Sequence, residues 1–260
     1  PFPHSPAGGW GWTDLPGSVP DADDTAGALL ALRQLGPIDE SVSTAGEAGI
    51  RWLLGLTNRN GGTPTFCRGW GKLPFDESSP DLTIHALQAY AAWRGALPPA
   101  LQRRVDRAIE RGLCYLADAQ HADGSWLPLW FGNDAVDGHE NPVYGTARVV
   151  VGLRQLEIQG GQLPPGMLAA GVWYLSDQMN PDGGWGGARG VASTVEETSL
   201  AVAALVDQPE ASQQIEAGRQ WLTATLDQPV PAAPIGLYFA SLWYFEKMYP
   251  AIFSLAALRT

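Results

Sequence analysis

The sequence contains one short phrase twice, QHADGSW at residues 120–126 and QMNPDGGW at residues 178–185. Shorter Gly-Trp clusters lie at residues 8–12 and 69–71. The tryptophans of the four clusters are 58, 56 and 59 residues apart: Trp12, Trp70, Trp126 and Trp185. A nearly constant period of this length indicates a repeat architecture. In each turn glycine supplies the backbone conformation, aspartate caps the next segment, and tryptophan buries a large area against its neighbours.

The segments between these turns have helical periodicity. From Asp24 the stretch DTAGALLALRQL places four apolar residues near one face, and Gly36 with Pro37 ends it; the four are Ala28, Leu29, Leu32 and Leu35. Strand signals are nearly absent. Helix pairs repeated at this period stack into an open solenoid or close into a ring, and periodicity alone does not choose between them. Further helices are predicted at residues 45–56, 81–93, 101–119, 144–156, 165–178, 195–205, 212–226 and 235–249.

The charge and composition exclude several classes of protein. The 260 residues carry a formal net charge of −11, which argues against nucleic-acid binding because phosphate contacts need a basic face. The same charge argues against electrostatic docking on anionic lipid, whereas contact of a small apolar patch with a membrane stays open. No apolar run approaches the roughly 20 residues of a spanning helix.

Cysteine and histidine usage predicts no metal site. Cys67 and Cys114 form no CxxC pair, and the four histidines are scattered. We therefore expect two free thiols in a reducing compartment. The chain starts at Pro1 and shows no basic-then-apolar leader. These features suggest a fragment, or a trimmed chain, of a protein of the cytosolic side.

Three carboxylates are crowded in the string DADDTA, which runs from Asp21 through Asp23 and Asp24 to Ala26. One of them would suffice to cap the helix that follows, since a carboxylate is favourable at the positive helix end. Crowded carboxylates cannot all ionise cheaply, so one keeps its proton while its neighbours carry charge. In an apolar pocket such a proton could pass to an alkene. Metal binding is the competing interpretation, but the DDxxD pattern is missing.

A carboxylate and an imidazole recur one helical turn apart in DLTIH, at Asp81 and His85. Asp81 could hold a protonated His85, and that imidazolium could raise the acidity of a nearby aspartic acid. A capping aspartate with a core histidine is the alternative interpretation of these two residues alone.

Together these motifs resemble squalene–hopene cyclases and related class II triterpene cyclases. The Asp21–Ala26 string is similar to the acid motif DxDDTA of that family, in which the position of Asp23 delivers the proton. The Asp81–His85 segment resembles the family's D-x-T-x-H, whose histidine hydrogen-bonds the catalytic aspartate. The phrases at 120–126 and 178–185 resemble its QW repeats. NPVYGT (141–146), AST (192–194) and the tail at 236–250 follow in the family's order, so the resemblance covers nearly the whole chain.

The resemblance implies an all-α fold, an (α/α) toroid, with Asp23 at the top of an aromatic-lined cavity. Asp21, Asp24, His85 and Asp81 are implied to support Asp23, and no cofactor or metal is implied. Protonation of a terminal alkene or epoxide of squalene or a similar polyprene would start a cyclisation cascade, with aromatic faces stabilising the carbocations. The candidate substrate-lining residues are Trp70, Trp130, Tyr144, Tyr238 and Phe245.

Several features depart from the family pattern. Residues 131–140 look like an insertion, and Pro142 and Leu242 stand where the family often has aromatic residues, so the lining and the product are expected to differ. We predict one (α/α)-barrel domain over residues 1–260, the C-terminal portion of a larger two-domain cyclase. Its expected partners are a long apolar isoprenoid and the missing N-terminal helical domain. The expected location is the cytoplasm, with peripheral contact at the inner face of a membrane left open.

Three alternatives remain open at this point. A class II diterpene cyclase uses the same acid on a prenyl diphosphate, but basic residues are few and the His85 segment fits triterpene enzymes better. A zinc-dependent prenyltransferase subunit shares the helical ring, yet no ligand set surrounds Cys67 or Cys114. A non-catalytic toroid that binds lipid or protein needs no acidic cluster backed by a histidine.

Overall fold

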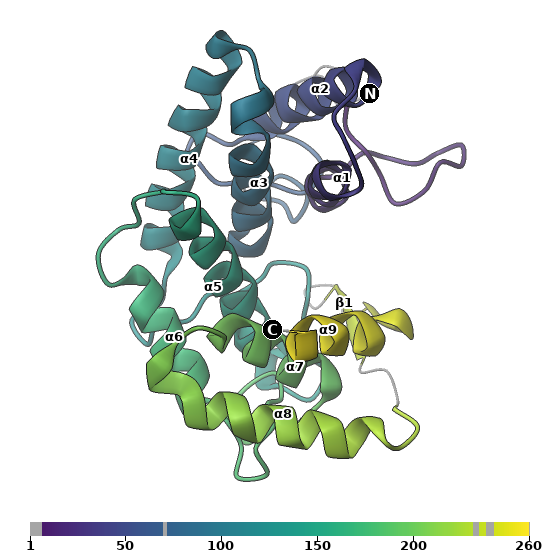
Figure 1. Ribbon diagram of the computed structural model, residues 1–260. Helices are drawn as coiled ribbons and strands as arrows, with labels where there is room; N and C mark the ends of the chain where they lie inside the picture. The colour runs from purple at the N-terminus through teal and green to yellow at the C-terminus, as the bar shows by residue number, and fades with distance from the viewer. Residues whose placement is uncertain (1–6, 70–71, 231–233, 238–241, 260) are drawn as a thin grey trace. The chain divides into compact units, whose positions relative to one another are not determined.

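A computed structural model describes residues 7–69, 72–230, 234–237 and 242–259 (Figure 1). The chain divides into two compact units. Unit 1 comprises Pro1–Ala119 and Gln155–Pro164, and unit 2 comprises Gln120–Arg154 and Pro165–Thr260. Helices make up most of the regular secondary structure of both units, as the sequence predicts. The single ring of helices expected over residues 1–260 depends on how the two units are joined, so it stays a prediction.

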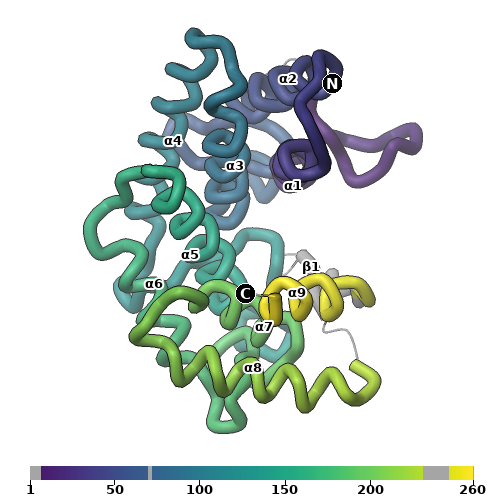
Figure 2. The backbone as a smooth tube through the Cα atoms, in the orientation of Figure 1, coloured from purple at the N-terminus to yellow at the C-terminus, as the bar shows by residue number. Residues whose placement is uncertain are grey.

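Unit 1 carries the purple-to-teal helices of Figure 1. Helix α3 contacts α1, α2 and α4, and its first residues follow an extended bridge between Thr63 and Ser79. The chain trace in Figure 2 shows α3 and α4 running side by side. The helices are α1 (Ala22–Gln34), α2 (Glu40–Leu56), α3 (Pro80–Trp93), the 3₁₀ turn η1 (Arg94–Ala96) and α4 (Pro99–Ala119).

Unit 2 is organised around α7, which contacts α6, α8 and α9. Helix α7 is buried along nearly its whole length, whereas α8 buries only one side. The elements are η2 (Asp137–His139), α5 (Pro142–Ile158, whose last residues belong to unit 1), α6 (Met167–Asp177), α7 (Val195–Leu205), η3 (Pro209–Ala211), α8 (Ser212–Leu226), β1 (Pro234–Leu237), β2 (Leu242–Phe245) and α9 (Met248–Arg259).

The predicted helix at 235–249 is wrong. The chain there forms an antiparallel hairpin in which Pro234 lies opposite Phe245 and Leu237 lies opposite Leu242. The run LWYF at 242–245 is rich in aromatic residues, which favour strands, and a proline is tolerated at the first residue of an edge strand. The helix begins only at Met248 and continues to Arg259.

Three turns share one hydrogen-bonding pattern. The backbone N–H of Asn180 donates to the carbonyl of Gly184 (2.9 Å), and the N–H of Gly183 donates back to Asn180 (2.9 Å). The same pair of bonds recurs at residues 121–125 and at 58–62. The left-handed glycine of each turn has φ near +90°, at Gly61 (+92°), Gly124 (+91°) and Gly183 (+89°). The equivalent turn of unit 1 is therefore NRNGGT at 58–63, which has no tryptophan, and Trp70 lies outside the described residues.

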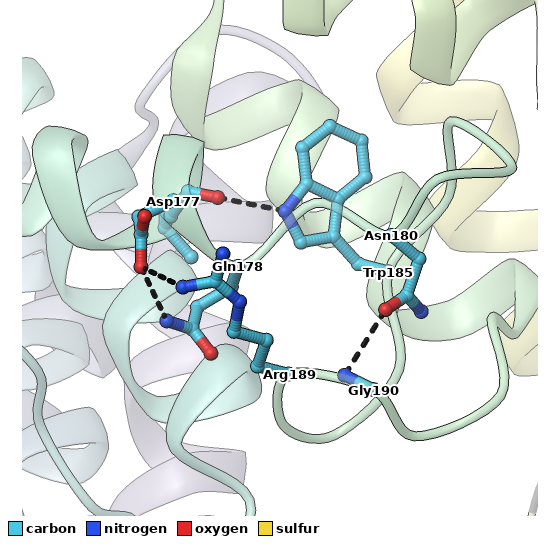
Figure 3. Close-up of polar contacts among 7 residues, drawn as sticks. Asp177, Gln178, Asn180, Trp185, Arg189 and Gly190 are labelled. Carbon is cyan, nitrogen blue, oxygen red and sulfur yellow. Dashed lines mark hydrogen bonds and ion pairs between the residues drawn. The ribbon is translucent and has the colours of Figure 1, made fainter.

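The tryptophans of these turns pack against glycines on the neighbouring helix. Trp126 and Trp185 are fully buried, as predicted for structural residues. The indole N–H of Trp185 donates to the carbonyl of Leu175 (2.8 Å; Figure 3). A Cβ on Gly218 would lie 2.8 Å from the Trp185 ring. In the first cluster, Trp12 is 75% exposed, and Trp10 takes the equivalent place against Gly49.

A loop after Trp185 closes this turn with polar contacts. Arg189 forms an ion pair with Asp177 (2.9 Å), and the amide of Gln178 donates to the same carboxylate (3.4 Å; Figure 3). The N–H of Gly190 donates to the side chain of Asn180 (3.1 Å). Two kinds of contact thus stabilise the turn: the hydrogen bond of the buried Trp185 indole, and the polar contacts of Arg189 and Gly190.

Four helix starts are joined to the preceding segment by a buried threonine. In each case a backbone N–H donates to the threonine Oγ1 of the helix, at 2.9–3.0 Å. All four threonines are fully or almost fully inaccessible to solvent. We call this contact the threonine joint. The pairs are Trp10–Thr25 on α1, Thr63–Thr83 on α3, Trp126–Thr146 on α5 and Trp185–Thr198 on α7.

Candidate active site

The carboxylate cluster lies at the first turn of α1. Asp21 is the N-cap, and its carboxylate oxygen accepts from the N–H of Asp24 (2.8 Å). The helix start is held from both sides, because Asp21 N–H donates to the Trp10 carbonyl (3.0 Å) and Ala22 N–H donates to the Thr65 carbonyl (2.9 Å). The cluster therefore sits on a rigid backbone.

Asp21 keeps a proton over an unusually wide pH range. Burial raises the pKa of its carboxyl to about 8, and a side-chain hydrogen bond with Asp24 acts in the same direction. The charges of Asp24 and Asp23 add to the shift, whereas the backbone N–H of Asp24 opposes it. Crowded carboxyl groups thus share protons instead of all ionising.

Asp23 pairs with the histidine that the sequence singles out. Nδ1 of His85 lies 2.6 Å from Oδ1 of Asp23 in a hydrogen bond, although the two residues are 62 positions apart. Asp23 keeps 39% of its side-chain surface accessible, and His85 keeps 13%. Gly27, one turn along α1, faces the same imidazole, since a Cβ there would be 3.7 Å from Cε1 of His85. Asp23 is therefore the acid of the cluster that His85 supports, and part of its side chain stays accessible.

Asp81 occupies a different environment from Asp23. It is 3% exposed and accepts a short hydrogen bond from the hydroxyl of Ser79, two residues before it in the chain. The Tyr115 hydroxyl, which donates to the Ser78 carbonyl (2.8 Å), is raised in pKa by burial and by the charge of Asp81. Asp81 is thus buried in the first turn of α3, one helical turn before His85.

The candidate lining residues fall in unit 2 or outside the described part of the chain. Tyr144 is 6% exposed and its ring lies 4.9 Å, centroid to centroid, from that of Phe131. Trp130 is half-buried. Phe245 belongs to strand β2, but its side chain lies outside the described residues, as do Trp70 and Tyr238 entirely. A cavity that joins any of them to Asp23 stays a prediction.

A buried polar network beside Tyr144 escaped the sequence analysis. Glu197 is 4% exposed and accepts from the amides of Asn133 (3.0 Å) and Asn141 (2.9 Å). Asn141 also accepts from the N–H of Tyr144 (3.0 Å), and Thr194 caps α7 by accepting from Glu197 N–H (3.2 Å). The Thr-x-x-Glu spacing of a capping box was the available signal for part of it. Asn133 lies in the stretch interpreted as an insertion, so that stretch is built into the unit.

Two absences complete the description. Within the part of the chain that the structure describes, no three His, Cys, Asp or Glu side chains form a group that could hold a metal ion. Over the same residues, none of the helices combines the length and apolar character that crossing a bilayer requires.

The fold is that of the type II terpene cyclases. It matches ent-copalyl diphosphate synthase from Streptomyces platensis with a TM-score of 0.65 at 23% identity, covering 95% of this chain and 43% of that one. A variant of the type II terpene cyclase MstE from Scytonema, in complex with geranylgeranyl dihydroxybenzoate, matches with a TM-score of 0.65 at 18% identity, covering 98% of this chain and 75% of that one. The helical toroid predicted from the sequence is the fold class of these proteins.

The chain itself belongs to the squalene–hopene cyclase C-terminal domain family, whose family model matches residues 2–258. It is 31% identical over 240 residues to a copalyl diphosphate synthase of Streptomyces cyslabdanicus, covering 90% of this chain and 38% of that protein. It is 29% identical over 222 residues to a squalene hopane cyclase of Aspergillus fumigatus, covering 71% of this chain and 29% of that protein. The chain thus spans less than two fifths of the length of either relative.

Proposed function

We propose that this chain is the acid-bearing domain of a class II terpene cyclase, with Asp23 as the proton donor. The observation that carries the proposal is the 2.6 Å contact between Asp23 and His85 at the start of α1, with Asp23 the accessible member of the pair. Membership of the cyclase family supports it.

The proton transfer follows from this geometry. With Oδ1 of Asp23 bonded to His85, the Oδ2–H of a protonated Asp23 passes its proton to the CH carbon of the terminal (CH3)2C=CH– group of the polyprene. The π electrons form the new C–H bond, a tertiary carbocation remains, and the carboxylate left behind is stabilised by the His85 N–H. Asp21, whose raised pKa keeps it protonated, adds no negative charge beside Asp23.

The substrate we propose is squalene or a similar long polyprene. Trp130 and Tyr144, together with Trp70, Tyr238 and Phe245, would line its path and stabilise successive cations through their π faces. Under this proposal the string DADDTA is the acid motif, and the turns at 120–126 and 178–185 are QW repeats that hold the fold.

A prenyl diphosphate is the second candidate substrate. Two of the similar proteins are copalyl diphosphate synthases, one a relative by sequence and one by structure. The same acid chemistry applies to the distal alkene of such a molecule, so the two candidates differ in the polar end of the substrate and not in the first step.

We also propose that a second, N-terminal helical domain completes the substrate cavity. The chain covers only 29% of the Aspergillus fumigatus relative and 38% of the Streptomyces cyslabdanicus relative, which supports this. Contact with a membrane surface on the cytoplasmic side belongs to the same proposal, because a polyprene of this length is held in lipid.

The test is a product assay with two substrates. The chain, alone and supplied with the N-terminal domain, is incubated with squalene or with geranylgeranyl diphosphate in mild detergent, and products are analysed by gas chromatography–mass spectrometry after phosphatase treatment of the diphosphate arm. A cyclic product that is lost in Asp23→Asn but kept in Asp118→Asn, an exposed aspartate on α4, is expected. Product that persists in Asp23→Asn overturns the assignment of the acid.

A further inference from the structure

The hydrogen bond between Asp23 and His85 joins two helices whose starts are each fixed independently of it. Asp23 lies in the first turn of α1, and His85 lies in the second turn of α3. A contact of 2.6 Å tolerates little movement of either helix, since hydrogen bonds weaken quickly with distance and misalignment. Something other than the pair must therefore hold the two helix starts in register.

The start of α1 is fixed by Thr25. Its hydroxyl accepts from the N–H of Trp10 (2.9 Å) and donates to the carbonyl of Trp10 (3.1 Å), so both backbone groups of Trp10 are satisfied by one side chain. Thr25 is fully buried, and it lies two residues after Asp23. Rotation or translation of α1 would break both bonds.

The start of α3 is fixed in the same way by Thr83. Its hydroxyl accepts from the N–H of Thr63 (2.9 Å) and donates to the carbonyl of Ser79 (2.7 Å). Thr83 is fully buried and lies two residues before His85. The acid and its histidine are thus each two residues from a threonine joint.

One short segment, residues 63–65, links the Thr83 joint to the start of α1 at Ala22. Thr63 donates its N–H to Thr83 on α3, and the carbonyl of Thr65 accepts from the N–H of Ala22 on α1 (2.9 Å). The intervening residue is Pro64, whose ring fixes one backbone dihedral. The segment therefore acts as a stiff spacer between the start of the acid helix and the start of the histidine helix.

We propose that Thr25 and Thr83 are positioning residues of the proton donor, and that with the Thr63–Thr65 spacer they set the distance between Asp23 and His85. The inference rests on the proposed function for its kinetic consequence, but its geometric content does not depend on catalysis. Neither threonine touches the substrate; each acts through the helix that carries the acid or its histidine.

The chain offers a matched control in unit 2. The Thr198 hydroxyl accepts from the N–H of Trp185 (2.9 Å) and donates to its carbonyl (3.2 Å), which reproduces the two bonds of Thr25 with Trp10. Thr198 is also fully buried. Thr25→Val and Thr198→Val therefore remove the same bonds with the same change of shape, one beside the acid and one on α7.

The experiment compares Thr25→Val, Thr83→Val, Thr25→Ser and Thr198→Val in the full chain. The first readout is the Nδ1 resonance of His85 in nitrogen NMR, assigned with His85→Ala, which reports its hydrogen bond to Asp23 without any substrate. The second is kcat and KM for the substrate that the product assay identifies. The third is the urea midpoint, which reports loss of stability alone.

We expect Thr25→Val and Thr83→Val to shift the His85 resonance and to lower kcat roughly 10- to 100-fold with little change in KM, because small displacements of a catalytic group cost factors of this size. Thr25→Ser keeps the hydroxyl and should restore both. Thr198→Val should lower the urea midpoint without moving the His85 resonance. Since Thr83→Val probes the same scaffold from α3, the test does not depend on Thr25→Val folding.

An unchanged His85 resonance in folded Thr25→Val and Thr83→Val would overturn the proposal, whatever happens to activity. A wild-type chain that stays inactive even when supplied with the N-terminal domain would instead count against the proposed function, and the His85 resonance would still decide whether the threonine joints position the pair.

Discussion

At the scale of single residues, the three aspartates at the start of α1 are close together in the sequence, but their side chains have different partners. Asp21 is a half-buried cap that shares a hydrogen bond with Asp24, whereas Asp23 is hydrogen-bonded to His85. Because one capping carboxylate is enough at this helix end, Asp23 and Asp24 are not needed as caps. The division of roles follows from which neighbour each side chain meets.

The raised pKa of Asp21 predicts a specific pH dependence of stability. Its carboxyl ionises near 3.8 in the unfolded chain and near 8 in the folded chain, so the stability it contributes is fully present below pH 3.8 and is lost as the pH rises towards 8. The slope is at most about 1.4 kcal/mol per pH unit. The side chain of Asp21→Asn stays neutral at every pH and loses no stability in this way. Between pH 5 and pH 8, the free energy of unfolding measured in urea titrations should therefore rise for Asp21→Asn relative to the wild type. Equal pH dependence in the two proteins would contradict this.

Asp81 is expected to matter for stability. Asp81→Ala removes the buried hydrogen bond that the Ser79 hydroxyl donates to the Asp81 carboxylate, and losing a hydrogen bond to a charged group costs about 1–3 kcal/mol. The free energy of unfolding in urea measures this loss. Asp118→Ala, on the exposed side of α4, serves as the control and should change it by less than about 0.5 kcal/mol. A loss of the same size in both variants would show that the Ser79 contact contributes nothing.

At the scale of helices and turns, the packing of tryptophan on glycine predicts a clear effect. A Cβ on Gly218 of α8 would lie 2.5 Å from Val202 and 2.8 Å from Trp185. Overpacking of this kind costs about 1–3 kcal/mol, although alanine is the better helix former by about 1 kcal/mol. Gly218→Ala should therefore lower the urea midpoint. Gly95→Ala in η1, where a Cβ would meet nothing within 4 Å, should leave it unchanged or raise it.

Most of the helices could be predicted from the sequence, because apolar periodicity depends only on residues close together in the chain. The helices at 195–205 and 212–226 have the predicted bounds. The strand pair 234–237 and 242–245 was missed because periodicity alone does not tell whether a short apolar run forms a helix or a strand. The turn at 58–63 was missed because it lacks the tryptophan used to count the repeat.

The candidate site divides in the same way. Asp23 and His85 were singled out from their motifs and from the family resemblance, and the structure brings the two side chains together. The threonine joints and the Asn133–Glu197 network depend on contacts between segments far apart in the chain, such as Trp10 with Thr25 and Asn133 with Glu197, which lie 15 and 64 positions apart. No local pattern encodes such pairings.

At the scale of the whole molecule, the net charge of −11 determines how the chain should meet lipid. An anionic membrane surface repels it over roughly 10 Å at 0.1 M salt. We expect vesicles of neutral phosphatidylcholine to bind at least as much chain as vesicles containing phosphatidylglycerol in flotation assays, with the difference shrinking as salt is added. Stronger binding to the anionic vesicles at low salt would show that a basic patch outweighs the net charge.

The threonine joints do not require a fixed number of residues between the backbone N–H donor and the threonine that accepts from it. The donor and the threonine are 15, 20, 20 and 13 residues apart in the four joints, yet the contact they make is the same. Residues can therefore be gained or lost in the intervening loops without displacing the helix start. Under the proposed function, the loops offer a protein engineer sites for remodelling the product spectrum while the start of α1, which carries Asp23, keeps its place.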